Sequence, residues 1–180
     1  EIVQEDSEQK VENTSTQANL TTLKDLDNEI KNAESNTTIK LTKDYKAVSN
    51  DKTIRIDKSL IIDGQGHTID AKNFSKVFKI LSGKGVTIKN LNVINSNGGR
   101  GGAISSNIPL TIININFTNT IDESYGGAIY CYCDNCFVMN CSFENCSANL
   151  KGGAICCYYC DNFFVMNCSF INCSASHGGA

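Results

Sequence analysis

The feature that most constrains this chain is a sequence unit that returns at a fixed interval in its second half. Each unit reads Gly-Gly-Ala-Ile, then a short apolar run, then Asn-x-x-Phe-x-Asn. Units begin at Gly101, Gly126 and Gly152, and a fourth begins at Gly178, so successive units lie 25, 26 and 26 residues apart. A constant period of this length indicates a repeat architecture, in which each unit stacks on its neighbour.

Composition within the unit decides between the two architectures that have such a period, leucine-rich repeats and β-helices. After residue 100 the only leucines are Leu110 and Leu150, and no apolar stripe at helical spacing occurs. Instead the units carry short runs of Val, Ile and Phe, such as residues 163–166, which are typical of strands. Gly, Asn, Ser and Asp separate these runs and favour bends. We predict an all-β fold, a right-handed parallel β-helix of about six turns.

The repeated residues themselves have structural explanations in such a fold. Phe at one position of each turn is expected to stack on the Phe of the next turn, forming an interior aromatic column. Asn at the bends is expected to form a hydrogen-bonded ladder, and paired glycines allow a thin corner. The residues assigned these structural roles are Gly101, Gly102, Phe117, Gly126, Gly127, Asn140, Phe143, Asn145, Gly152, Gly153, Asn167, Phe170 and Asn172.

The start of the chain divides into two parts. Residues 1–19 are polar, acidic and without periodicity, which predicts a disordered leader or linker before a β-helix domain over 20–180. Thr22-x-x-Asp25 is a variant of the capping box that begins helices. Apolar residues follow it at helical spacing, namely Leu23, Leu26, Ile30 and Ala33. We predict a helix over about 22–34 that covers the open end of the β-helix, because an uncovered first turn exposes the core and unpaired backbone.

Between this helix and the repeats, short apolar runs alternate with Gly- and Asn-rich bends. Strands are predicted at 38–41, 53–56, 60–62, 67–69, 77–80, 86–88 and 91–94. These early turns lack the Gly-Gly-Ala corner, as terminal repeats often do. The repeats run over 101–180 and stop within a unit, from which we expect a longer array.

The pairing of a Gly-Gly-Ala-Ile corner with an Asn-Cys-Ser-Phe strand end, as in residues 126–129 and 140–143, resembles two groups of surface proteins. These are the adhesin-like β-helix proteins of methanogenic archaea and the repeats of polymorphic membrane proteins. Residues 59–70, with their Asp-Gly-Gln-Gly bend, are similar to the opening turns of the first group. The resemblance implies a secreted or cell-surface β-helix that mediates attachment to carbohydrate or protein on another cell, or acts as a rigid stalk.

Charge excludes some partners. The net charge is −3, from 16 basic and 19 acidic residues. After Arg100 the only basic side chains are Lys151 and His177, whereas a nucleic-acid groove needs clustered Lys and Arg. No apolar run approaches the length of a membrane span. Because the chain begins with Glu, we expect that a signal peptide has been removed and that the protein is extracellular or on the cell surface.

All ten cysteines lie between Cys131 and Cys173. Cys141 and Cys168 are 27 residues apart, as are Cys146 and Cys173, so each pair is expected at one position on neighbouring turns. Neighbouring turns bring Cα atoms within disulfide range. Such cysteines can also remain small buried hydrophobic residues. The sequence leaves disulfides and a column of free thiols both open.

A third interpretation of the cysteines is a metal site. The spacing of four cysteines matches that of a four-thiolate zinc site: Cys133-x-x-Cys136 is followed, after twenty residues, by Cys157-x-x-Cys160. A repeat of this length produces the same spacing without any metal. We therefore prefer a column or disulfides and predict no cofactor.

Parallel β-helices also include polysaccharide lyases and hydrolases, so a pectate lyase-like enzyme or a glycoside hydrolase is the alternative function. A hydrolase needs paired carboxylates roughly 5–10 Å apart. Asp63 and Asp70, which flank His67, are the best candidates, whereas Asp134 and Asp161 occupy equivalent bends and read as turn residues. Asp-Gly-x-Gly is also an ordinary bend, and we expect no catalysis.

Tyrosines offer a binding surface. We predict an outward aromatic strip formed by Tyr130, Tyr132 and Tyr158, each of which is next to a cysteine in the sequence. Aromatic side chains with a polar end are frequent at surfaces that bind sugars or proteins. The sequence therefore predicts a non-catalytic adhesin-like β-helix with a weak candidate ligand site at these tyrosines.

Overall fold

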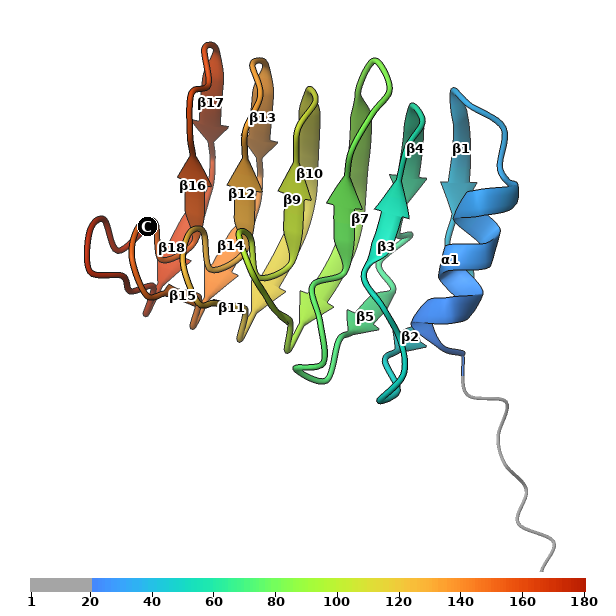
Figure 1. The fold of residues 1–180 in the computed structure, drawn as a ribbon, viewed down its shortest axis with the longest axis horizontal. Helices are drawn as coiled ribbons and strands as arrows, with labels where there is room; N and C mark the ends of the chain where they lie inside the picture. The colour runs from blue at the N-terminus through green and yellow to red at the C-terminus, as the bar shows by residue number, and fades with distance from the viewer. Residues whose placement is uncertain (1–20) are drawn as a thin grey trace, which may run out of the picture.

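The computed structural model describes residues 21–180. They form a single solenoid in which parallel strands stack along the long axis of the molecule in about five turns, with one helix at the N-terminal end (Figure 1). The all-β parallel β-helix predicted from the repeats is confirmed, but it has about five turns and not the six predicted. The predicted leader over 1–19 lies outside the described residues. The helix of this part of the chain is too short and too polar to cross a membrane.

Three parallel sheets form the walls of the solenoid. The main path of the first is β1 (Thr37–Lys40), β4 (Leu60–Asp63), β7 (Val86–Ile94), β10 (Leu110–Thr118), β13 (Cys136–Met139) and β17 (Phe163–Met166). Beside that path lie β2 (Tyr45–Lys46), β5 (Thr68–Asp70), β14 (Ser142–Glu144) and β18 (Ser169–Ile171). The second sheet contains β3 (Ile54–Ile56), β6 (Phe78–Ile80), β9 (Ile104–Ser106), β12 (Ile129–Cys131) and β16 (Ile155–Cys157). The third contains β8 (Asn97–Gly98), β11 (Ile121–Asp122) and β15 (Ser147–Ala148).

The predicted cap is helix α1 (Leu23–Asn32). Its N-cap Thr22 accepts a hydrogen bond from the amide of Asp25, and the Asp25 carboxylate accepts one in return from the amide of Thr22. This capping box satisfies two amides that the first turn leaves unpaired. The apolar stripe of α1 is fully buried and covers the end of the solenoid beside β2 and β3 (Figure 1).

The predicted strand positions are confirmed within one or two residues for β1, β3, β4, β5 and β6. Two predictions were wrong. The runs 86–88 and 91–94 form one strand, β7, because Asn90 adopts a left-handed φ of 54° and bends the strand without ending its pairing. The two-residue strand β2 was missed, since so short a segment leaves no periodicity to detect.

The interior contains a column of phenylalanines. Phe117 and Phe143 are fully buried, and their rings stack with centroids 5.0 Å apart and planes 6° from parallel. Phe143 stacks in turn on Phe170 at 4.9 Å and 5°. This geometry follows from the register, since Phe117 pairs with Phe143 and Phe143 with Phe170 on successive strands.

Asparagine ladders run along two bends of the solenoid. In one ladder the amide of Asn114 donates to Asn90 at 3.1 Å. In the other, the amides donate down the stack at 3.2–3.3 Å, from Asn172 to Asn145, from Asn145 to Asn119 and from Asn119 to Asn95. All of these asparagines have φ between 51° and 54°. Asn fits because it tolerates left-handed backbone and its short amide reaches the next turn.

The Gly-Gly corner is required by close contact between turns. A Cβ on Gly127 would lie 2.0 Å from the carbonyl oxygen of Gly153 in the next turn, and Gly102 has the same relation to Gly127. Real Cβ contacts are not this short, so any side chain would push two turns apart. The pair therefore fixes the spacing of the turns at this corner.

We predict that Gly127→Ala lowers the free energy of unfolding by at least about 2 kcal/mol, because backbone on both sides of the added methyl cannot move aside. Urea denaturation followed by circular dichroism measures this change. Gly99→Ala is the matched control, since a Cβ there meets nothing within 4 Å. Equal destabilisation of the two variants would contradict the steric role of the corner.

Candidate functional site

A cavity of about 540 Å³ opens beside the second sheet, on the side where β9, β12 and β16 lie. Four tyrosines and three basic side chains line it, and its other lining residues are Gly99, Ser105 and Asn107. The tyrosines are Tyr125, Tyr130, Tyr132 and Tyr158, and the basic residues are Lys76, Lys79 and Arg100. We call this cavity the tyrosine groove. Among residues 21–180, no acidic side chain lines it.

The structure brings together the three tyrosines that the sequence singled out. Tyr132 and Tyr158 are 48% and 42% exposed, and their rings stack with centroids 6.2 Å apart and planes 22° from parallel. Tyr130 also lines the groove but is only 8% exposed, because the ring of Tyr125 packs against it with centroids 6.2 Å apart.

Sequence reasoning missed Tyr159, the most exposed of the aromatic residues at this position. Its ring meets those of Tyr158 and Tyr132 edge-on, at centroid distances of 4.5 and 6.1 Å. Tyr159 is an inserted residue with a left-handed φ of 53°. The extra residue can be detected from the repeat spacing. Residues that pair on neighbouring turns are 26 positions apart at Cys131 and Cys157 but 27 apart at Cys136 and Phe163.

The basic side of the groove was also missed. Lys76 is buried, and its ammonium donates to the carbonyls of Gly99 and Arg100, each at 2.6 Å, and to the Ser105 hydroxyl at 3.2 Å. Burial lowers the pKa of Lys76 to about 8, although attraction to Asp122 acts in the opposite direction. Lys76 thus holds the bend that carries the exposed Arg100. In the sequence this lysine is indistinguishable from the solvated lysines around it.

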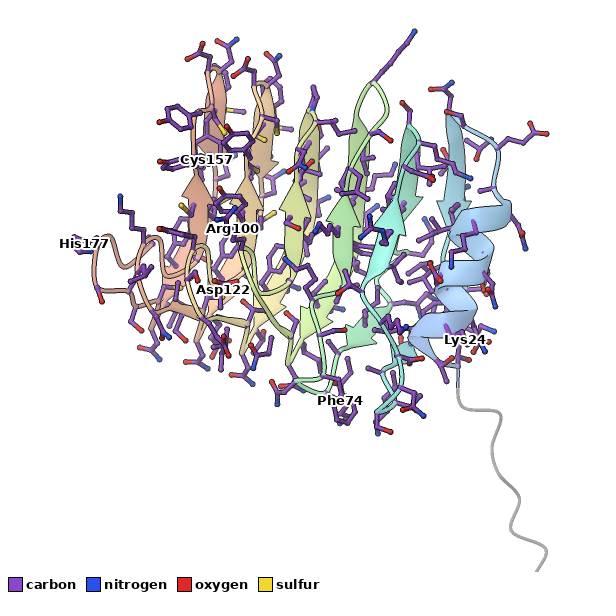
Figure 2. All side chains as sticks on the ribbon, viewed as in Figure 1. Lys24, Phe74, Arg100, Asp122, Cys157 and His177 are labelled. Atoms are coloured by element: carbon purple, nitrogen blue, oxygen red, sulfur yellow. The ribbon has the colours of Figure 1, made fainter. Side chains whose placement is uncertain are left out.

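A buried carboxylate supports the same region. Asp122 is fully buried and accepts hydrogen bonds from the amides of Ser124 and Tyr125, at 2.5 and 2.6 Å. Burial raises the pKa of this carboxyl group. Its hydrogen bonds fix the backbone of Tyr125, which lines the groove. Figure 2 shows Asp122 below Arg100, toward the β11 side of the solenoid.

The candidates for catalysis have structural partners. Asp63 and Asp70 accept hydrogen bonds from the amides of Asn90 and Asn95, at 2.9 and 3.0 Å, and so form the first steps of the two asparagine ladders. His67 lies on the surface with its Nδ1 3.1 Å from the Asp44 carboxylate. Asp63 also forms an ion pair with Lys89, and Asp70 forms one with Lys72. This arrangement supports bends and offers no exposed carboxylate pair at these positions.

All ten cysteines are free thiols in this structure. Cys141 and Cys168 lie on neighbouring turns, as do Cys146 and Cys173, and the thiols of Cys168 and Cys173 donate to the backbone carbonyls of Val138 and Phe143 in the turn before. The inner member of each pair, Cys141 or Cys146, is buried in the core. These four cysteines pack as small apolar side chains along the solenoid.

A different arrangement surrounds Cys131. The sulfur atoms of Cys131, Cys133 and Cys136 all lie within 4.8 Å of one another. Cys157, from the next turn, is the register partner of Cys131 in the pairing of β12 with β16. We call these four residues the thiol cluster. Hydrogen bonds from the other thiols lower the pKa of Cys157 to about 6. Of the four cysteines with zinc spacing in the sequence, Cys133 and Cys136 lie beside Cys131, Cys157 is the register partner of Cys131, and Cys160 lies at the edge.

Comparison with known proteins gives one family. A family model described as "Putative pectate lyase-like adhesive domain" matches residues 17–130, which cover the capping helix and the first turns of the solenoid through β12. Searches of curated proteins and of solved structures give no match to this chain.

The ladder position of Asp63 has a consequence for acid stability. Burial disfavours its charge, but hydrogen bonds from Asn90 and Gln65 and the nearby Lys89 outweigh burial and lower its pKa to about 2. The unfolded value is about 3.9. The Asp63 carboxylate therefore stabilises the fold above pH of about 4, and this stabilisation is lost as the pH falls toward 2.

We predict that Asp63→Asn flattens the fall in unfolding free energy between pH 5 and pH 2, measured by urea denaturation at each pH. Asp57→Asn, at an exposed position, is the matched control and should keep the wild-type profile. An unchanged pH profile for Asp63→Asn would show that the carboxylate does not stabilise the ladder.

Proposed function

The chain belongs to the pectate lyase-like adhesive domain family, and on this premise we propose that it adheres to carbohydrate through the tyrosine groove. The observation that carries the proposal is the joint presence of four tyrosines and three basic side chains around one cavity of about 540 Å³. Clefts of a few hundred Å³ with aromatic walls and a few directed polar groups are typical of ligand sites.

The tyrosines supply flat surfaces for sugar rings. The stacked pair Tyr132 and Tyr158 exposes nearly half of each side chain at the groove. One face of a pyranose ring is largely C–H, and it packs on an aromatic face while the hydroxyls remain in water. Ser105 and Asn107, also in the lining, offer hydrogen-bond partners for such hydroxyls.

The charge of the groove favours an anionic sugar. Arg100 and Lys79 are exposed, and no acidic side chain faces them within the lining. A guanidinium binds a carboxylate or a sulfate with two parallel hydrogen bonds. We therefore expect glycans that carry uronic acid or sulfate groups to bind more tightly than neutral glycans of the same length.

The solenoid would act as the support that presents this groove. Because successive turns are hydrogen-bonded in register, the face stays stiff and extends with each added turn. The adhesive description of the family supports a location outside the cell. We propose binding without turnover, since Asp63 and Asp70 are engaged in the asparagine ladders.

We predict that Tyr132→Ala and Arg100→Ala each weaken binding to a uronic-acid oligosaccharide by about tenfold, because one removes a stacking face and the other an ion pair. Isothermal titration calorimetry with the anionic oligosaccharide and a neutral one measures this. Added salt should weaken binding of the anionic sugar only.

Matched controls lie outside the groove. Phe74→Ala removes an aromatic ring that is 52% exposed, at the lower edge of the molecule and away from Arg100 (Figure 2). Lys84→Ala removes a basic side chain at an exposed bend. Both should bind as the wild type does. Wild-type affinity in the groove variants, or a protein ligand that binds while glycans do not, would contradict the proposal.

A further inference from the structure

The thiol cluster is the chemically most distinctive feature outside the tyrosine groove. Two of its members, Cys131 and Cys136, are fully buried, and the other two are half-buried. All four pack against the hydrophobic core. A column of small apolar side chains requires only one cysteine per turn, as seen for Cys141 and Cys168. Here three sulfur atoms from a single turn converge on one point.

We propose that Cys131, Cys133, Cys136 and Cys157 bind a soft tetrahedral divalent ion of the Zn²⁺ class. Four thiolates in a compact group are the donor set that such ions prefer. Figure 2 shows Cys157 on the β16 side of the molecule, the side that also carries the tyrosines of the groove.

The spacing of the sulfur atoms fits this ion. A Zn–S bond length of about 2.3 Å gives about 3.8 Å between sulfurs at the corners of a tetrahedron. The three sulfurs from one turn lie within 4.8 Å of one another, and those of Cys133 and Cys136 are 3.2 Å apart. Side-chain rotations that change these sulfur–sulfur distances by up to about 1 Å would bring the three to the required positions.

The local backbone explains why the sulfurs converge. Cys131 ends β12 and Cys136 begins β13, so the bend between the two strands turns both side chains toward the core. Cys133 lies within that bend. Cys157 pairs directly with Cys131 in the parallel register of β12 and β16, so the next turn supplies the fourth sulfur.

Cys160 is better placed as a neighbour than as a ligand. Its thiol donates to the carbonyl of Cys131 at 3.4 Å and accepts from the amide of Cys133 at 3.5 Å. These contacts hold its sulfur against the backbone at the edge of the cluster. Amide donors to sulfur are also typical of the surroundings of thiolate sites.

A disulfide is the competing arrangement for these sulfurs, because paired strands about 4.8 Å apart bring Cα atoms within disulfide range. A bond between Cys131 and Cys157 would use two of the four sulfurs, whereas one metal ion can bind all four.

Binding replaces the protons that the ligand thiols still carry with bonds to the ion, so zinc uptake should release protons to the buffer. The experiment titrates the full chain, purified under reducing conditions and stripped with a chelator, with Zn²⁺ and separately with Co²⁺. We expect one ion per chain by elemental analysis. We also expect the Co²⁺ form to show thiolate charge-transfer absorption and the intense visible bands of tetrahedral cobalt.

The variants distinguish the cluster from other thiols. Cys133→Ser and Cys157→Ser change half-buried ligands and should each weaken Zn²⁺ binding by more than about tenfold, with circular dichroism confirming that the β-helix remains folded. Cys168→Ser and Cys173→Ser, half-buried positions outside the cluster, are the matched controls and should retain one ion.

Protection from alkylation provides an independent measurement. With Zn²⁺ bound, the four cluster thiols should resist a thiol reagent until a chelator is added. Failure to take up Zn²⁺ or Co²⁺, or equal metal content in the cluster and control variants, would overturn the proposal. A disulfide between Cys133 and Cys136 in the freshly isolated chain would overturn it as well. These readouts are independent of glycan binding by the tyrosine groove.

Discussion

Hydrogen bonding between parallel strands of successive turns is the constraint on which the rest of this structure depends. Each backbone group in a strand is satisfied by the turn above and the turn below, so neither the core nor the bends can depart from a spacing of about 4.8 Å. That spacing explains why the same residue types recur. Phenylalanines stack face to face at 4.9–5.0 Å, asparagine amides reach the next amide, and Gly127 has no room for a side chain.

The bends make this stacking possible. A strand that must turn every few residues needs positions with left-handed backbone, and non-glycine residues rarely adopt it. Asparagine fills most of these positions here and adds a hydrogen bond along the stack at the same time. The first step of each ladder is an aspartate, Asp63 or Asp70, which can only accept the amide proton of the asparagine above. Residues that resemble a catalytic pair in the sequence are thus explained as ends of structural ladders.

Stacking also creates the two candidate sites, because in-register turns place equal side chains side by side. Tyr132 and Tyr158 form an aromatic platform for this reason, and Cys131 and Cys157 meet for the same reason. The two sites share one bend, since Cys131 lies between Tyr130 and Tyr132 in the sequence. An ion in the thiol cluster would link two turns directly beneath the tyrosines and would limit their motion. The buried Lys76 and Asp122 hold the other side of the groove in place.

The sequence by itself determined the architecture, because a 26-residue repeat of strand-forming residues and bends allows few folds other than a parallel β-helix. It also determined the capping helix, whose Thr22 box and apolar stripe are local signals. Only the tertiary structure decided the sites. Lys76 and Arg100 meet Tyr158 across several turns, and Tyr130 is buried by packing that no local pattern records. Likewise the bend between β12 and β13 brings the sulfur of Cys131 to those of Cys133 and Cys136, a convergence that the spacing of the cysteines in the sequence does not show.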